Sequence, residues 1–186
     1  MINRTSTKDA LAASFEQLAA SRAINKIKIA EITENCGVSY PMFYYYFKDM
    51  DDAVNYIFTK QFEAHCTAEP EDMDFPWLLE TLSDMIEEKR NFYINVLQNS
   101  HGVNALYTQS ANFILDYIRK KIAGRFEDGA IPSNLDMMLE FYICGIRTRT
   151  CDLITGVPGT DRNEIIQIYM DALPADLRPY LIPDRH

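Results

Sequence analysis

Residues 40–47 hold the side chains whose types and spacing best suit binding chemistry, in the order Tyr-Pro-Met-Phe-Tyr-Tyr-Tyr-Phe. Tyrosine hydroxyls bond to phosphates or to base edges, and apolar groups contact the methyl group of thymine. Five consecutive aromatic residues cannot all face one way on a helix with 3.6 residues per turn. We therefore expect Phe43 and Phe47 to anchor the helix on a core. The residues predicted to form the outward-facing surface are Tyr40, Pro41, Met42, Tyr44 and Tyr45.

A helix, a tight turn and a second helix over residues 28–47 would position this surface. Apolar residues share one stripe of the first helix, at Ile29, Ile32 and Cys36. Gly37 suits the left-handed backbone that ends a helix, and Ser39 suits the N-cap of the next one. Pro41 falls in the first turn, where its missing N–H costs little. Two short helices at a glycine-bearing turn predict a helix-turn-helix, whose second helix can enter a DNA major groove.

Basic residues flank this motif. Lys28 and Lys48 are predicted backbone anchors, and Arg4 in the amino-terminal arm is predicted to contact a phosphate or the minor groove. Residues 40–46 contain no Arg, Asn or Gln, so we expect DNA shape and methyl contacts to carry more of the base discrimination. The alternative interpretation is that the tyrosine cluster belongs to the core.

The net charge of −9 argues at first against DNA binding, but its distribution is uneven. Residues 1–48 carry six basic and four acidic side chains, whereas the other 138 residues carry twelve basic and twenty-three acidic ones. The amino end is therefore locally positive, which phosphate contacts require.

The motif resembles that of TetR-family transcriptional regulators. The residues that carry the resemblance are Ile29, Ile32, Gly37, Val38, Ser39, Phe43, Tyr44, Phe47 and Val54. It implies a dimer that binds a palindromic double-stranded DNA operator, acting as a repressor that alters its grip when a small-molecule effector binds. The stretch around Phe92 is similar to a subgroup that includes regulators of dihydroxyacetone utilisation.

Three positions depart from the family pattern. Pro41 stands where the family usually has a small residue, Met42 where it often has Thr, and Met50 where it often has Lys. That lysine commonly contacts a phosphate, and Lys48 can take its place.

The rest of the chain is predicted to be helical, because it lacks the alternation of apolar and polar residues that is typical of strands. The sequence predicts an all-α fold of about nine helices, in two parts. Residues 1–66 would form a three-helix DNA-binding domain containing the helix-turn-helix, and residues 67–186 a helical effector-binding and dimerisation domain. We expect residues 173–186, which hold three prolines, to lie over the surface.

Aromatic and methionine side chains between residues 75 and 155 suggest an effector pocket. Arg147 is the best polar candidate, because a buried arginine needs an anionic partner. That partner would be a ligand carboxylate, Glu140 or Asp116, and each pocket residue also fits an ordinary core role. The predicted pocket residues are Met85, Phe92, Tyr93, Phe113, Tyr117, Met138, Phe141, Tyr142 and Arg147.

The last two long helices are too apolar for fully solvated outer faces, which predicts a homodimer built through them. The residues predicted at that interface are Ile143, Ile146, Ile154, Ile165, Ile168 and Tyr169.

Other functions have weaker support. His65, Cys66 and His101 are the plausible metal ligands, and neighbours such as His65 and Cys66 cannot face one side of a helix. No phosphate-binding glycine loop or nucleophile motif is present, so we predict no enzyme, metal or cofactor. The main alternative is a TetR-like helical adaptor that has lost specific DNA binding. The excess of acidic residues after residue 48 and the Met50 that replaces a phosphate-contacting lysine would both fit this alternative.

The cysteine spacing suits neither paired metal ligands nor a small disulfide framework, which favours reduced thiols. No signal peptide or membrane span is apparent. These features predict a soluble, cytoplasmic protein.

Overall fold

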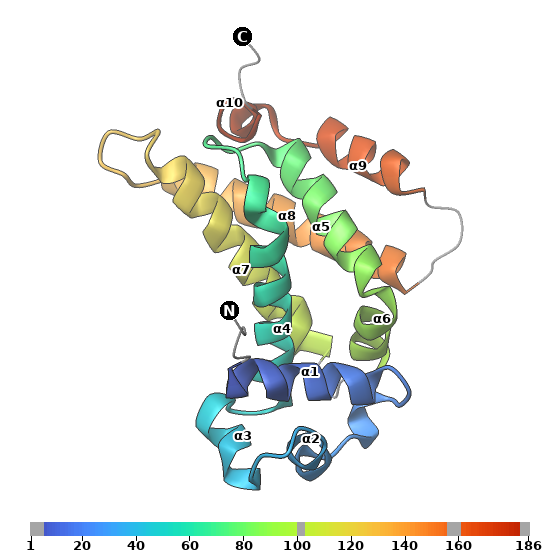
Figure 1. The fold of residues 1–186 in the computed structure, drawn as a ribbon. Coiled ribbons are helices and arrows are strands. Elements are labelled where there is room, and N and C mark those ends of the chain that lie inside the picture. The colour runs from blue at the N-terminus through green and yellow to red at the C-terminus, as the bar shows by residue number, and fades with distance from the viewer. Residues whose placement is uncertain (1–5, 100–102, 156–160, 183–186) are drawn as a thin grey trace.

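The computed structural model describes residues 6–99, 103–155 and 161–182, and its regular structure in these ranges is entirely helical (Figure 1). The α-helices are α1 (Thr7–Ala19), α2 (Ile29–Asn35), α3 (Tyr40–Tyr46), α4 (Met50–His65), α5 (Phe75–Glu88), α6 (Arg90–Asn99), α7 (Val103–Ala123), α8 (Ser133–Ile154), α9 (Arg162–Asp171) and α10 (Arg178–Leu181). Three short 3-10 helices are η1 (Ile24–Lys26), η2 (Cys66–Ala68) and η3 (Ala175–Leu177). The all-α prediction is confirmed.

Helices α1, α2 and α3 form one end of the molecule, at the bottom of Figure 1. Gly37 has a φ of +72°, so the chain turns between α2 and α3 through the left-handed conformation predicted for it. Ser39 occupies the N-cap position of α3, but its side chain makes no capping hydrogen bond, unlike the prediction. Asp49 does cap α4, since its carboxylate accepts from the N–H of Asp52 at 2.8 Å.

Helix α4 joins this end to the rest of the chain. It packs against α1 on one side and against α5 and α7 on the other. The buried apolar side chains form one continuous cluster, from Leu11 in α1 to Leu181 in α10. The predicted domain boundary after residue 66 therefore falls just beyond α4, a helix that packs against both predicted domains.

The carboxy-terminal segment is more buried than predicted. Residues 173–182 include η3 and α10, and Leu177 and Leu181 are almost fully buried. The ring of Tyr180 stacks on Phe126 at a centroid distance of 4.9 Å. The prediction that this segment lies over the surface is wrong for its described part, because its leucines recur at a spacing of four and reach the core.

Helix α6 packs against the end formed by α1, α2 and α3, and its Asn95 makes three hydrogen bonds there. The Asn95 amide donates to the carbonyl oxygens of Ala19 and Arg22, both at 2.7 Å, and its oxygen accepts from the N–H of Ile24 at 3.1 Å. The ion pair between Lys89 and Glu16 lies next to this junction and also involves α1. Asn95 thus satisfies backbone groups just after the end of α1, where helical partners run out.

Asn95→Ala should lower the free energy of unfolding by about 2 kcal/mol, because it leaves partly buried backbone groups without these partners. Urea unfolding followed by circular dichroism measures the change. Asn91→Ala is the matched control, since Asn91 lies on the same helix and is exposed. Equal stability of the two variants would contradict the role given to Asn95.

Candidate nucleic-acid interface and ligand cavity

The tyrosines of α3 lie outside the core. Tyr40, Tyr44 and Tyr45 are 49%, 51% and 77% exposed, whereas Phe43 and Phe47 are almost fully buried. The rings of Phe43 and Phe47 contact each other at a centroid distance of 5.5 Å. With Phe43 and Phe47 buried four residues apart, Tyr44 and Tyr45 between them face solvent, whereas Tyr46 is half-buried.

The exposed tyrosines form an ordered pair. The hydroxyls of Tyr40 and Tyr44 are 3.3 Å apart, and the two rings meet edge to face at 5.6 Å. The hydrogen bond with Tyr40 raises the pKa of Tyr44, so its hydroxyl stays protonated at neutral pH. Phenol hydroxyls can donate hydrogen bonds to phosphate oxygens or to acceptor atoms of bases.

Most of the other predicted DNA-contact residues are also exposed. Ser39, Pro41, Lys28 and Lys48 are exposed, and Met42 is half-buried. Lys28 begins α2, where its N–H donates to Glu31 at 2.8 Å. Arg4 lies outside the described residues.

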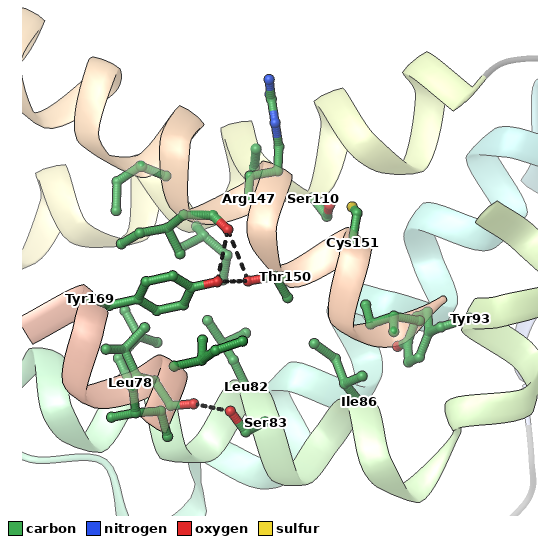
Figure 2. A pocket seen from close by; sticks show the side chains of 18 of the residues that line it. Leu78, Leu82, Ser83, Ile86, Tyr93, Ser110, Arg147, Thr150, Cys151 and Tyr169 are labelled. Carbon is green, nitrogen blue, oxygen red and sulfur yellow. Dashed lines mark hydrogen bonds between the residues drawn. The ribbon is translucent and has the colours of Figure 1, made fainter. Parts of the chain in front are cut away.

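A cavity of about 150 Å³ lies among α4, α5, α6, α7, α8 and α9. Figure 2 shows labelled side chains from α5, α6, α7, α8 and α9 converging on it. Its wall is mainly aliphatic. The apolar lining residues are Phe58, Phe75, Leu78, Leu79, Leu82, Ile86, Leu97, Ala111, Ile114, Ile143, Ile146, Ile154, Ile165 and Ile166.

Hydroxyl groups are the main polar feature of this wall. Thr150 Oγ1 donates to the carbonyl of Ile146 at 3.0 Å and lies 3.1 Å from the Tyr169 hydroxyl. Ser83 Oγ donates to the carbonyl of Leu79 at 2.7 Å. Figure 2 shows these bonds on opposite sides of the cavity.

Two of the predicted pocket residues, Tyr93 and Arg147, line this cavity. The others lie elsewhere in the fold. Met85, Phe92 and Tyr142 are buried in the core, Phe113 and Tyr117 pack their rings on Phe62, Met138 is half-buried, and Phe141 is 84% exposed. These seven residues do not line the cavity, since most of them fill contacts between helices.

The arginines of the wall are not arranged to hold an anion inside. In Figure 2 the guanidinium end of Arg147 points away from Tyr169 and Thr150. Arg162 forms an ion pair with Asp84 at 2.7 Å. The two carboxylates suggested as partners for Arg147, Asp116 and Glu140, both lie within ion-pair distance of Arg119.

Several wall residues were within reach of sequence reasoning. Ile143, Thr150, Cys151 and Ile154 lie three, four or seven residues from Arg147 and so share its helical face. Ser83 and Tyr169 come from other helices, and nothing in the sequence spacing connects them to α8.

Helix α6 contacts both candidate sites. Tyr93 and Leu97 line the cavity, while Asn95 holds the end of α1. The Tyr93 hydroxyl also donates to the amide oxygen of Gln61 in α4 at 2.6 Å. Burial raises the pKa of Tyr93, so this hydroxyl remains a donor. Helix α6 therefore connects the cavity wall to the end formed by α1, α2 and α3 through direct contacts.

Within the described ranges, no group of three His, Cys, Asp or Glu residues is placed to hold a metal ion. The four cysteines, residues 36, 66, 144 and 151, form no disulfide bonds with one another and are half-buried. No helix in the described ranges combines the length and apolar character that crossing a membrane requires.

No protein-family model and no curated protein sequence matches the chain. Its structure is similar to a solved structure described as dihydroxyacetone kinase operon activator DhaS, with a TM-score of 0.61. The match covers 94% of this chain and 98% of the other, at 18% sequence identity. The fold is TetR-like. At this identity the likeness establishes the fold and not the function.

Proposed function

We propose that this protein is a DNA-binding transcriptional regulator of the TetR type. It acts as a homodimeric repressor that binds a palindromic operator. Its affinity for the operator changes when a small molecule enters the cavity. The observation that supports this most is the exposed tyrosine surface of α3, presented by the second helix of a helix-turn-helix at one end of the molecule.

The tyrosine surface suits the major groove better than it suits water. Large apolar rings that stay exposed on a folded protein indicate an interaction surface. Here they are accompanied by hydroxyl donors and by exposed Lys28 and Lys48, which suit phosphates. Because α3 has no Arg, Asn or Gln for bidentate reading of bases, methyl contacts and DNA shape would carry the specificity.

The proposed dimer uses the exposed faces of α8 and α9. Met137 and Phe141 on α8 are 72% and 84% exposed, and Ile168 on α9 is 51% exposed. Of the six residues predicted at this interface, Ile168 is the exposed one. Ile143, Ile154, Ile165 and Tyr169 are buried within the protomer, and Ile146 lines the cavity, so they are not available to a partner.

Two-fold symmetry would set the form of the operator. An interface through α8 and α9 leaves both copies of α3 exposed. Two recognition helices about 34–36 Å apart reach successive major grooves on one side of a duplex. The operator should then be a palindrome with half-sites about one helical turn apart.

The main experiment measures how tightly the protein binds a DNA duplex taken from the region upstream of its own gene. The measurement is repeated at several salt concentrations. Affinity should fall linearly with salt on logarithmic axes, because phosphate contacts release counterions. Lys48→Ala should reduce the slope by about one, and Tyr44→Ala should weaken binding about tenfold. Lys120→Ala is the control for Lys48→Ala, since Lys120 is also exposed but lies on α7.

Unchanged binding by Lys48→Ala and Tyr44→Ala would show that the surface is misassigned. An absence of salt-dependent DNA binding in the parent protein would instead favour the helical adaptor.

The dimer is tested by placing a charge on its proposed face. Phe141→Asp should shift the protein from dimer to monomer in light scattering at micromolar concentration, since a carboxylate in an apolar interface is strongly unfavourable. Asn112→Asp is the matched control because it adds the same charge at an exposed position on α7. A parent protein that is already monomeric would contradict the interface.

A further inference from the structure

We propose that the cavity binds one uncharged molecule about the size of a single aromatic ring, and that this molecule donates a hydrogen bond to the wall. This assignment rests on the proposed role of the cavity as an effector site and adds the chemical class of the effector. It follows from the size of the cavity, from the placement of its cations and from the direction of its hydroxyl groups.

The volume limits the ligand to a small molecule. A cavity of 150 Å³ with a largely aliphatic and aromatic wall is comparable to apolar cavities of about 150 Å³ that hold one benzene molecule. Drug-sized ligands occupy pockets of about 300–1,000 Å³. The wall therefore suits one ring, whose burial is favourable because it removes apolar surface from water.

The charges around the cavity exclude an ionic ligand. Arg162 is held by Asp84, and its second nitrogen donates to the carbonyl of Glu80 at 3.2 Å. The guanidinium of Arg147 is directed away from Tyr169 and Thr150 (Figure 2). The residues that line the described cavity include no Asp, Glu, Lys or His. A carboxylate would thus enter an apolar space whose two arginines are paired with Asp84 or directed elsewhere, and an ammonium group would meet no acidic side chain; both are strongly unfavourable.

The hydroxyl groups favour a donor over an acceptor. A hydroxyl has one proton to donate and two lone pairs that accept. Ser83 and Thr150 already direct their protons to backbone carbonyls, of Leu79 and Ile146. What they present to a ligand is lone pairs, and these match the O–H of a phenol or the N–H of an indole. A ligand that carries only acceptor atoms would bury those atoms against Ser83 and Thr150 without receiving a hydrogen bond from either.

The test uses four ring-sized probes with the full-length protein: phenol, benzonitrile, benzoate and benzylammonium. Ligand-observed NMR at neutral pH measures saturable binding of each. Phenol should bind, benzonitrile should bind at least about fivefold more weakly, and the two ions should not bind. Benzoate or benzylammonium binding as tightly as phenol, benzonitrile equalling phenol, or no saturable phenol binding would each overturn the proposal.

Paired variants show whether a bound probe occupies this cavity. Ala111→Phe fills the space at a wall residue of α7, and Ala123→Phe makes the same change on α7 away from the wall. Phenol binding should be lost in the first and kept in the second. If Ala111→Phe does not fold, Ser83→Ala serves instead, since removing an acceptor should weaken phenol severalfold and leave benzonitrile unchanged. Equal phenol binding by Ser83→Ala and the parent would contradict the hydroxyl assignment.

The outcome is separable from the proposed function. If the parent protein binds phenol but no DNA, the proposed ligand class is supported and the proposed regulatory function is contradicted. If the parent protein binds DNA but none of the probes, the proposed ligand class is contradicted and the proposed regulatory function is supported.

Discussion

The anchoring of α3 by two phenylalanines is the constraint on which the rest of the structure depends. Phe43 and Phe47 are almost fully buried, and they hold a seven-residue helix against the core at this end of the molecule. With Phe43 and Phe47 committed to the core, the helix presents Tyr40, Tyr44 and Tyr45 to solvent. The exposed tyrosines thus follow from the same packing that keeps the helix folded. A helix this short depends on such contacts, because isolated short helices are marginal in water.

The two candidate sites lie in different parts of the molecule and are joined by α4 and α6. Helix α4 packs on both parts, and α6 carries cavity-lining Tyr93 and the Asn95 that binds the end of α1. The Tyr93 hydroxyl links the two joining helices through Gln61. Because core packing is dense, a ligand that displaces the cavity wall has to shift these neighbours as well. The proposed regulation needs no contact beyond those present in the protomer.

The sequence predicted the fold and the exposed surface well, because both follow from local patterns. Glycine at residue 37 and the spacing of Phe43 and Phe47 define the turn and its second helix, and apolar periodicity defines the longer helices. The cavity was predicted poorly. Its wall combines side chains from helices far apart in the chain, and an aromatic residue such as Phe141 has the same local pattern whether it faces a ligand, the core or solvent. The burial of Leu177 and Leu181 was missed for the same reason.

The most direct test of the central claim is selection of binding sites from random duplex DNA. The parent protein should enrich a palindrome with half-sites about one helical turn apart. A variant with alanine at Tyr40, Tyr44 and Tyr45, which keeps the buried phenylalanines, should enrich no motif. Enrichment of the same palindrome by that variant, or of no palindrome by the parent, would contradict the account.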